Sequence, residues 1–300
     1  MLTIDVVAKH TELGHRVAAL LTELDRGQQA HVKAVPNPGA LDTGQEPAAF
    51  VVAVTDSAGL AHREAFSFWA DVVLVHGSDT QRDRSIRHLW QTRLAPFAQN
   101  LADQQFARAG APELSASDPT WQTTANRLIR RLRRATAHLG RAGEFRWEHI
   151  GSTSVPGLSA KPFIDLQLGV ASLDELHGLD QAVFQCGFID VATVAPDSPG
   201  VLRDTPRGTG HGPDACWDKR LFASADPGQR VILHVREIGS PWWRYTIRFR
   251  DLLRADSEAR QDYERLKARL VEAHSGDQNN DAYTIAKTVF FDAIQDRLDQ

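Results

Sequence analysis

One stretch near the middle of the chain constrains the fold most. Residues 148–170, EHIGSTSVPGLSAKPFIDLQLGV, place a Gly-Ser loop before a strictly alternating run. Because side chains alternate along a strand, the apolar members of this run share one face. They are Ile164, Leu166, Leu168 and Val170, while the other face carries Phe163, Asp165, Gln167 and Gly169. The run predicts a half-buried strand with one polar face, and FRWEHI before the loop predicts its neighbour.

The loop and the strand together suit phosphate chemistry. Gly151 lets backbone amides approach a phosphate closely, Ser152 adds a hydroxyl donor, and Asp165 can hold Mg²⁺ against phosphate oxygens. A simpler interpretation stays open. Gly-Ser and Pro-Gly are ordinary turn residues, and one aspartate on a strand is not a metal site.

Length and composition are those of a globular protein. With 300 residues the chain can form roughly two domains that each bury a core. A net charge of −4 gives no overall attraction to nucleic acid or anionic membranes. Two cysteines, Cys186 and Cys216, cannot build a disulfide framework and indicate a reducing compartment. Because no basic leader or run of about 18 apolar residues occurs, we expect a soluble cytoplasmic protein without a membrane span.

The first 110 residues predict an α/β domain. LTIDVV, AAFVVAVTD and DVVLVHGSD predict strands, and the continuous apolar run Val72–Val75 is typical of a parallel sheet buried on both faces. A helix over 83–108 is expected to break near Pro96. Residues 109–118 are rich in Ala, Ser and Pro, which predicts a linker to a second domain over 111–300.

A basic helix follows the linker. Apolar residues from Trp121 to Leu139 recur at helical spacing, and arginines fill much of the opposite arc. These arginines are Arg127, Arg130, Arg131, Arg133 and Arg134. A basic face can bind nucleic acid, but a charge-rich helix is more often solvated. We therefore expect a solvated face and no nucleic-acid partner.

The rest of the chain alternates strands, loops and helices. A helix is expected over about 172–185, followed by a long loop rich in Pro, Gly and Asp. His211, Asp214 and Cys216 in that loop match no zinc-binding spacing, which favours a surface loop. DKRLFASADPGQRVILHVRE predicts a hairpin that turns at residues 226–228, and the C-terminal segment after it is helical.

HIGSTSVPGLSAKPFIDLQLGV resembles the signature of the GrpB family of nucleotidyltransferase-like proteins. The resemblance continues in order through DKRLFASADPGQRVILHVRE, SPWWRYTIRFRDLLRAD, YERLKARL and YTIAK, from about Asp118 to the C-terminus. It implies the nucleotidyltransferase fold, a small mixed sheet with helices. In that fold a Gly-Ser pair precedes Asp-x-Asp or Asp-x-Glu on the next strand.

In that superfamily, paired carboxylates hold two metal ions during nucleotidyl transfer. The matching positions here are Gly151, Ser152, Asp165 and Gln167. The resemblance thus implies Asp165 and Gln167 as the catalytic pair, with Mg²⁺ bound by Asp165. Gln167 offers a neutral oxygen where an acid is expected, so activity does not follow from the fold alone.

The family motifs hold further candidates for binding a nucleotide or another phosphorylated small molecule. Besides Gly151 and Ser152 they are Thr153, Lys161, Lys219, Arg220, His234, Arg250, Tyr283 and Lys287. Cations around one carboxylate suit a polyphosphate. Tyr283 and Lys287, four apart on a helix, can project together. His234 fits a site residue and a buried histidine equally well.

The N-terminal region has its own resemblance. LWQTRLAPFAQNLADQQFARA followed by SDPTW resembles the junction of actinobacterial fusions in which a GrpB-like domain follows dephospho-CoA kinase, and FVVAVTDSAGL and WADVVLVHGSD resemble later kinase strands more loosely. An active P-loop kinase needs GxxxxGK[ST]. The chain has no Gly-Lys dipeptide, and AKHTELGHR follows LTIDVV. Residues 1–110 therefore predict a shortened, degenerate kinase-like domain, without kinase activity.

The predicted architecture is thus a shortened P-loop-kinase-like α/β domain followed by a nucleotidyltransferase-fold domain with a mixed sheet and C-terminal helices. Two functions are open. The first is binding of a nucleotide or related phosphorylated ligand at Gly151, Ser152 and Asp165. The second is a non-catalytic accessory module in coenzyme A metabolism, for which we expect an exposed apolar patch or a homodimer.

Overall fold

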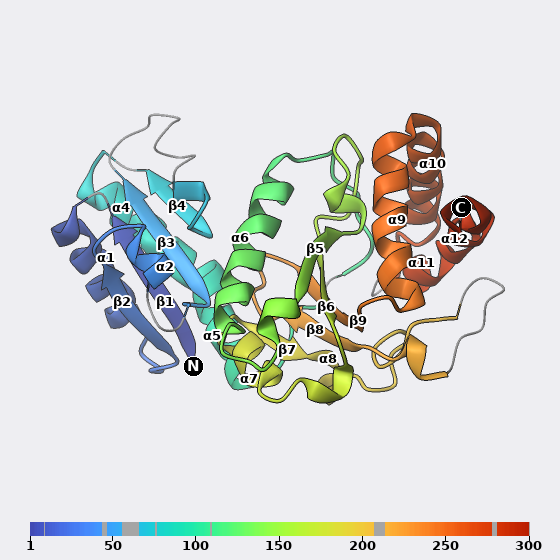
Figure 1. The fold of residues 1–300 in the computed structure, drawn as a ribbon. Coiled ribbons are helices and arrows are strands. Elements are labelled where there is room, and N and C mark those ends of the chain that lie inside the picture. The colour runs from blue at the N-terminus through green and yellow to red at the C-terminus, as the bar shows by residue number, and fades with distance from the viewer. Residues whose placement is uncertain are drawn as a thin grey trace.

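The computed structural model describes residues 1–8, 10–43, 47–55, 66–75, 77–108, 110–206, 214–277 and 281–299. These residues form two β-sheets with helices packed against them (Figure 1). A parallel sheet comes first and a mixed sheet second, as the predicted fold class requires. The described ranges contain no helix that is both long and apolar enough to cross a membrane. His211, which we assigned to a surface loop, lies outside them.

The N-terminal sheet has parallel strands in the order β2-β1-β3-β4. Their bounds are β1 (Leu2–Ala8), β2 (Ala30–Val35), β3 (Phe50–Thr55) and β4 (Val72–Val75). The central strand β3 is buried throughout, whereas the edge strand β4 is only half-buried. One face packs against α1 (Thr11–Leu24), α4 (Asp79–Leu89) and α5 (Ala95–Ala102), and the short α2 (Ala40–Thr43) packs on the other.

The helix predicted over 83–108 contains an irregular turn. It consists of α4, a π-helical turn at Trp90–Leu94, and α5, which ends at Ala102. The π-helical turn directly precedes Pro96, whose ring would clash with the preceding turn of a regular helix. The helix is thus irregular near Pro96, as expected, but Leu94 and Ala95 keep helical dihedral angles, so it continues without a break and ends at Ala102, earlier than expected.

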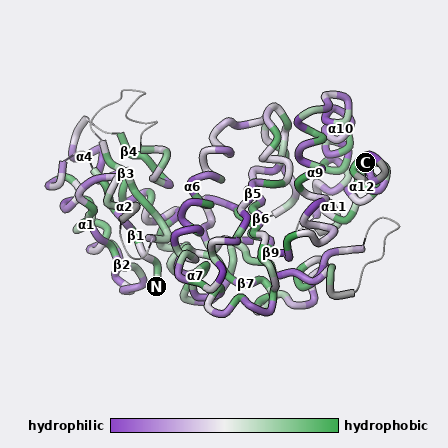
Figure 2. Tube along the Cα trace, in the orientation of Figure 1, coloured by the Kyte–Doolittle hydropathy of each residue, from purple (hydrophilic) through white to green (hydrophobic). Residues whose placement is uncertain are grey.

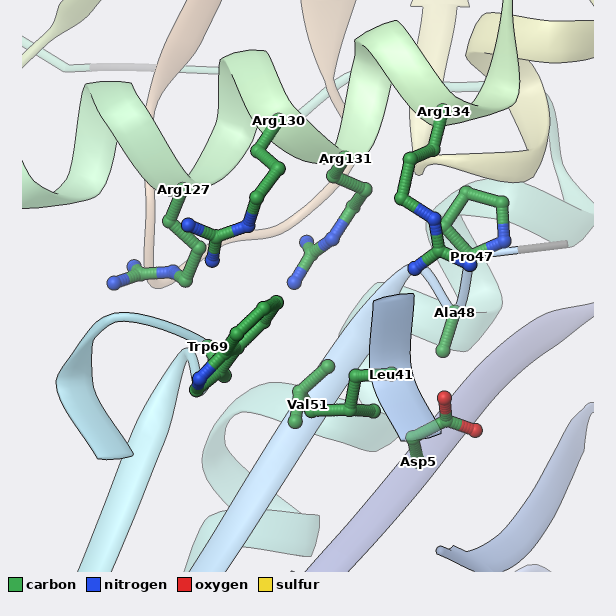
Figure 3. Close-up of a pocket in the computed structure, with 10 residues that line it drawn as sticks. All are labelled: Asp5, Leu41, Pro47, Ala48, Val51, Trp69, Arg127, Arg130, Arg131 and Arg134. Carbon is green, nitrogen blue, oxygen red and sulfur yellow. The ribbon is translucent and has the colours of Figure 1, made fainter. Parts of the chain in front are cut away.

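The basic helix α6 (Thr120–Ala135) lies against the N-terminal sheet. Figure 3 shows four of its arginines pointing toward β3 and Trp69. Arg127 and Arg131 are buried and hold the Asp71 carboxylate, at 3.2 Å from Nε and 2.5 Å from Nη2. The expectation of a solvated face is wrong for these two, because the other sheet and not water covers them.

The C-terminal sheet has the order β5-β6-β9-β8-β7, in which β6 and β9 run parallel and the other pairs antiparallel. Its strands are β5 (Arg146–Ile150), β6 (Ile164–Val170), β7 (Phe188–Asp190), β8 (Arg220–Ser224) and β9 (Val231–Glu237). The β8–β9 hairpin is as predicted. The helix expected over 172–185 begins later, as α7 (Leu179–Gln185), and α8 (Val191–Val194) lies in the predicted long loop.

The predicted alternation of β6 is confirmed. Leu166 and Leu168 belong to the core under α6 and α7, while Asp165 and Gln167 point away from it. Helices cover that polar side: α9 (Pro241–Ala255), α10 (Ser257–Ala273), α11 (Asp281–Ala286), α12 (Thr288–Ala293) and α13 (Gln295–Asp299). Figure 2 shows hydrophobic and hydrophilic residues mixed along α9 and α10. Their apolar sides join a separate core around Phe249 and Tyr263.

Candidate functional site

Asp165 lies directly against the Gly151 turn that follows β5. Gly151 has a φ of +69°, and a Cβ placed on it would lie 2.9 Å from the Asp165 Cγ and nearer still to a carboxylate oxygen. Both the positive φ and the close approach require glycine. The Gly-Ser turn therefore fixes the position of the carboxylate rather than standing free of it.

The Asp165 carboxylate is only partly open to solvent. Its side chain is 31% exposed, and Oδ1 lies 4.0 Å from His234 Nε2. Burial raises the pKa of Asp165 to about 6, while the positive charges of Lys287, Lys161 and Arg236 act in the opposite direction. The effect of burial on the pKa is thus larger than that of the three cations, so Asp165 takes up a proton at a higher pH than a surface carboxylate does.

Two predicted lysines converge beside Asp165. The Lys161 and Lys287 Nζ atoms lie 4.7 Å and 5.0 Å from the centroid of the Tyr283 ring. Tyr283 is itself buried, which raises the pKa of its hydroxyl to about 12. Helix α11 ends between Tyr283 and Lys287, yet the two side chains still meet as predicted. The structure therefore brings Lys161 and Lys287 to one ring, near enough to Asp165 for their charges to lower its pKa.

A second tyrosine and lysine, absent from our candidates, complete this side of the site. The Tyr263 hydroxyl hydrogen-bonds to Ser152, and Lys267 donates to the Ser159 carbonyl. Lys267 is buried, and burial together with the charge of Lys287 lowers its pKa to about 7. A sequence signal existed: Tyr263 and Lys267 have the same four-residue spacing as Tyr283 and Lys287.

Gln167 is held in a buried polar network. Its Oε1 accepts from Arg236 Nη1 at 2.6 Å and from Thr246 Oγ1 at 2.9 Å, and its Nε2 donates to the Trp243 carbonyl at 3.3 Å. The side chain has no exposed surface. Gln167 thus holds Arg236 and α9 in place, and its predicted catalytic role stays a prediction.

Arg236 was also missing from our candidates, although it follows His234 by two residues and so shares its face of β9. It is buried and binds Asp204 twice, through Nε at 2.6 Å and Nη2 at 2.9 Å. Arg236 Nη2 also lies 3.3 Å from His234 Nδ1. Since a guanidinium only donates, Nδ1 accepts and the neutral imidazole carries its proton on Nε2, toward Asp165. Burial, with Arg236 and Lys219 nearby, lowers the pKa of His234 and keeps it neutral.

The two basic residues that open the β8 hairpin lie on opposite faces of the sheet. Lys219 is buried and bound to Asp204 at 2.9 Å, and burial lowers its pKa to about 8. Arg220 instead binds Asp180 and Asp190 on the other face. Adjacent residues on a strand cannot face the same way. The prediction that Arg220 belongs to the site is therefore wrong. Lys219 contributes to the site indirectly, because it binds the Asp204 carboxylate.

Thr153 and Arg250 serve the frame of the loop. Thr153 Oγ1 donates to the Phe163 carbonyl at 2.9 Å and lies 3.1 Å from His149 Nε2. Arg250 Nη1 binds Glu148 at 2.6 Å and donates to the His149 carbonyl at 3.0 Å. These side chains hold β5 and the turn in place, and their predicted phosphate contacts stay predictions.

The donors around Asp165 do not fit Mg²⁺. This ion needs an octahedral set of oxygen ligands, usually with one or two carboxylates. On β6, Asp165 is one such carboxylate, and Gln167 stands where the second is expected. The Gln167 oxygen is occupied, and the groups that act on Asp165 are cations. Mg²⁺ at Asp165 remains an untested prediction that this donor set does not favour.

Comparison with known proteins defines the class. Residues 111–297 match the family model described as GrpB protein, and this match spans more than half of the chain. The chain therefore belongs to the GrpB family. A UPF0157 protein of Streptomyces coelicolor is similar to it, with 35% identity over 193 residues, 63% of this chain and 87% of that protein.

The chain is also similar to dephospho-CoA kinases. The enzyme of Mycolicibacterium paratuberculosis is 35% identical over 220 residues, which cover 72% of this chain and 52% of the kinase. The enzyme of Mycobacterium tuberculosis H37Rv is 38% identical over 200 residues, which cover 65% of this chain and 48% of the kinase. The chain thus spans about half the length of these relatives. The first alignment exceeds residues 111–297, so the kinase-like similarity reaches into the N-terminal region.

A crystal structure of GrpB from Enterococcus faecalis covers 62% of this chain and 96% of its own, with 21% sequence identity and a TM-score of 0.47.

Proposed function

We propose that the protein binds a nucleotide or a related phosphorylated small molecule at Asp165. The observation that supports this most is the convergence of Lys161 and Lys287 on one Tyr283 ring beside the Gly151-Ser152 turn. Two ammonium groups next to backbone amides are suited to phosphate oxygens. The buried Arg236 beneath them adds positive charge to the same place.

Binding is a better proposal than nucleotidyl transfer. Transfer with two metal ions needs two carboxylates on β6, and Gln167 gives its oxygen to Arg236 and Thr246. Ser152 and Tyr263 supply hydroxyls, and the neutral His234 presents an N–H toward Asp165. These groups can orient a ligand and donate hydrogen bonds to it.

A ligand screen tests the proposal. The full chain would be titrated by calorimetry with nucleoside triphosphates, pyrophosphate and coenzyme A precursors, each with and without Mg²⁺. We expect at least one of these anions to bind. If none binds in either buffer, the proposal is wrong.

A second function is favoured by the comparisons. The similarity to dephospho-CoA kinases extends before residue 111, while the chain lacks the Gly-Lys of a P-loop. We therefore propose, as the alternative, an accessory role in coenzyme A metabolism without kinase activity. Binding of dephospho-CoA without its turnover would support this alternative, and binding confined to other nucleotides would not.

A further inference from the structure

In the polar network beneath Asp165, the position where a second metal ligand is expected is occupied by Gln167. Its side chain binds the buried cation Arg236. Gln167, two residues after Asp165, turns its Oε1 to the Arg236 guanidinium at 2.6 Å and to Thr246 at 2.9 Å. The Thr246 hydroxyl has one hydrogen and also lies 3.0 Å from the Trp242 carbonyl, so the Arg236 guanidinium is the firm donor to this oxygen. A metal ion there would have to lie beside that guanidinium.

Arg236 cannot easily move aside. It is 2% exposed, and the paired Asp204 carboxylate receives two of its hydrogen bonds. Asp204 in turn holds Lys219 at 2.9 Å. Arg236 and the protonated Lys219 share the one Asp204 carboxylate, so these three groups together carry a net charge of +1 beneath Asp165.

Lysines supply the positive charge on the open side. Lys161 and Lys287 both act on the Asp165 carboxylate, and both lie within about 5 Å of the Tyr283 centroid. Asp165 is thus a counter-ion of both lysines. A phosphate that enters would take over this role and would be repelled by Asp165 as long as the aspartate is ionised.

We infer that this site binds phosphates without a divalent metal: Lys161, Lys287 and Arg236 supply the positive charge, and Asp165 is the counter-ion that the phosphate displaces. The inference rests on the proposed function and deepens it. In this inference Asp165 competes with the phosphate for the lysines and weakens ligand binding. A carboxylate that held a metal ion would instead strengthen it.

The test is a calorimetric titration of the full chain with ATP and with pyrophosphate, in EDTA and in excess Mg²⁺. We expect affinity in EDTA to be equal to or higher than in Mg²⁺, because the metal masks the charge that the lysines bind. The near-isosteric Asp165→Asn variant should bind about fivefold or more tightly than wild type in EDTA. Lys287→Gln should bind about tenfold more weakly.

Two controls make the outcomes separable. Lys33→Gln removes the same charge from a half-exposed lysine on β2, in the other sheet, and should bind like wild type. Melting temperatures show whether each variant folds, and Lys161→Gln replaces Lys287→Gln if the latter does not.

Binding that requires Mg²⁺ and is lost in Asp165→Asn would overturn the inference while leaving the proposed function intact. Absence of binding by the wild type in both buffers would overturn both.

Discussion

At the scale of single residues, the site depends on a contact between a backbone and a carboxylate. Gly151 and Asp165 touch because the turn has a positive φ and no Cβ. The sequence identified both residues, since a Gly-Ser loop before an alternating strand is a local pattern. It could not identify Asp204, because the role of this residue comes from contacts with Lys219 and Arg236, 15 and 32 residues further along the chain. For Arg236 and Lys267 the spacing from His234 and Tyr263 was the only sign.

Replacing Gly151 tests this contact. In Gly151→Ala the new Cβ would meet the Asp165 carboxylate and the backbone would be strained, which costs on the order of 1–3 kcal/mol of unfolding free energy. Urea unfolding measures the loss. Gly143→Ala is the matched control, since a Cβ there meets nothing within 4 Å and no positive φ is involved. Equal stability of both variants would refute the contact.

His149 gives the fold a pH dependence. It is buried, and burial first, then Arg254 and Arg250, lowers its pKa from 6.5 to about 4. Between these values the unfolded chain binds a proton that the folded chain does not. The stability that this residue contributes is therefore complete above pH 6.5 and is lost as pH falls toward 4.

The comparison of wild type with His149→Gln isolates that contribution. From pH 7 to 4 we expect the wild type to lose on the order of 3 kcal/mol more unfolding free energy than the variant. The difference between the two pH profiles cancels the contributions of groups that both proteins share, such as Asp165. Parallel wild-type and His149→Gln profiles would contradict the assignment.

At the scale of elements, alternation and helical spacing predicted which segments form strands and helices, but not what lies against them. The arginine face of α6 was expected in water, but Arg127 and Arg131 lie against the first sheet, because periodicity distinguishes two faces without saying what covers each. Strand β2 was missed since its alternating His31 and Lys33 are exposed at a sheet edge. Arg220 was misplaced because we grouped it with its sequence neighbour Lys219. Adjacent residues on a strand point to opposite faces of the sheet.

Asp71 is the residue on which the α6 interface depends. Asp71→Asn would leave Arg127 and Arg131 buried without their carboxylate, which costs about 3–5 kcal/mol of unfolding free energy. Chemical denaturation measures it. Asp262→Asn removes one partner of the exposed pair with Arg265 and should cost less than about 1 kcal/mol. Similar losses of unfolding free energy in both variants would show that the buried ion pairs of Asp71 contribute no more than an exposed pair.

At the scale of the whole molecule, a four-stranded parallel sheet is joined to a GrpB domain. Arg93 before α5 binds Asp226 in the β8–β9 turn, at 2.9 Å from Nε and 2.6 Å from Nη2. The two sheets are therefore connected by buried ion pairs as well as by the chain. Family resemblance predicted both halves, while the contacts between them required the structure.

The absence of a P-loop sequence from these 300 residues leads to a prediction about kinase activity. With ATP, Mg²⁺ and dephospho-CoA we expect no coenzyme A formation above the uncatalysed level, since no lysine stands in a GxxxxGK[ST] loop to balance the phosphate charge. A coupled assay for ADP release, run beside an active dephospho-CoA kinase, would check it. Turnover by this protein would show that another cation replaces the P-loop lysine.

The central claim, a phosphate-binding site formed by Lys161 and Lys287 beside Asp165, is tested most directly by titrating ATP into the Lys161→Gln/Lys287→Gln double variant and into wild type. We expect the double variant to bind at least about a hundredfold more weakly, about 2.7 kcal/mol, while Lys33→Gln binds as wild type does. Equal binding by the double variant and wild type would contradict the account.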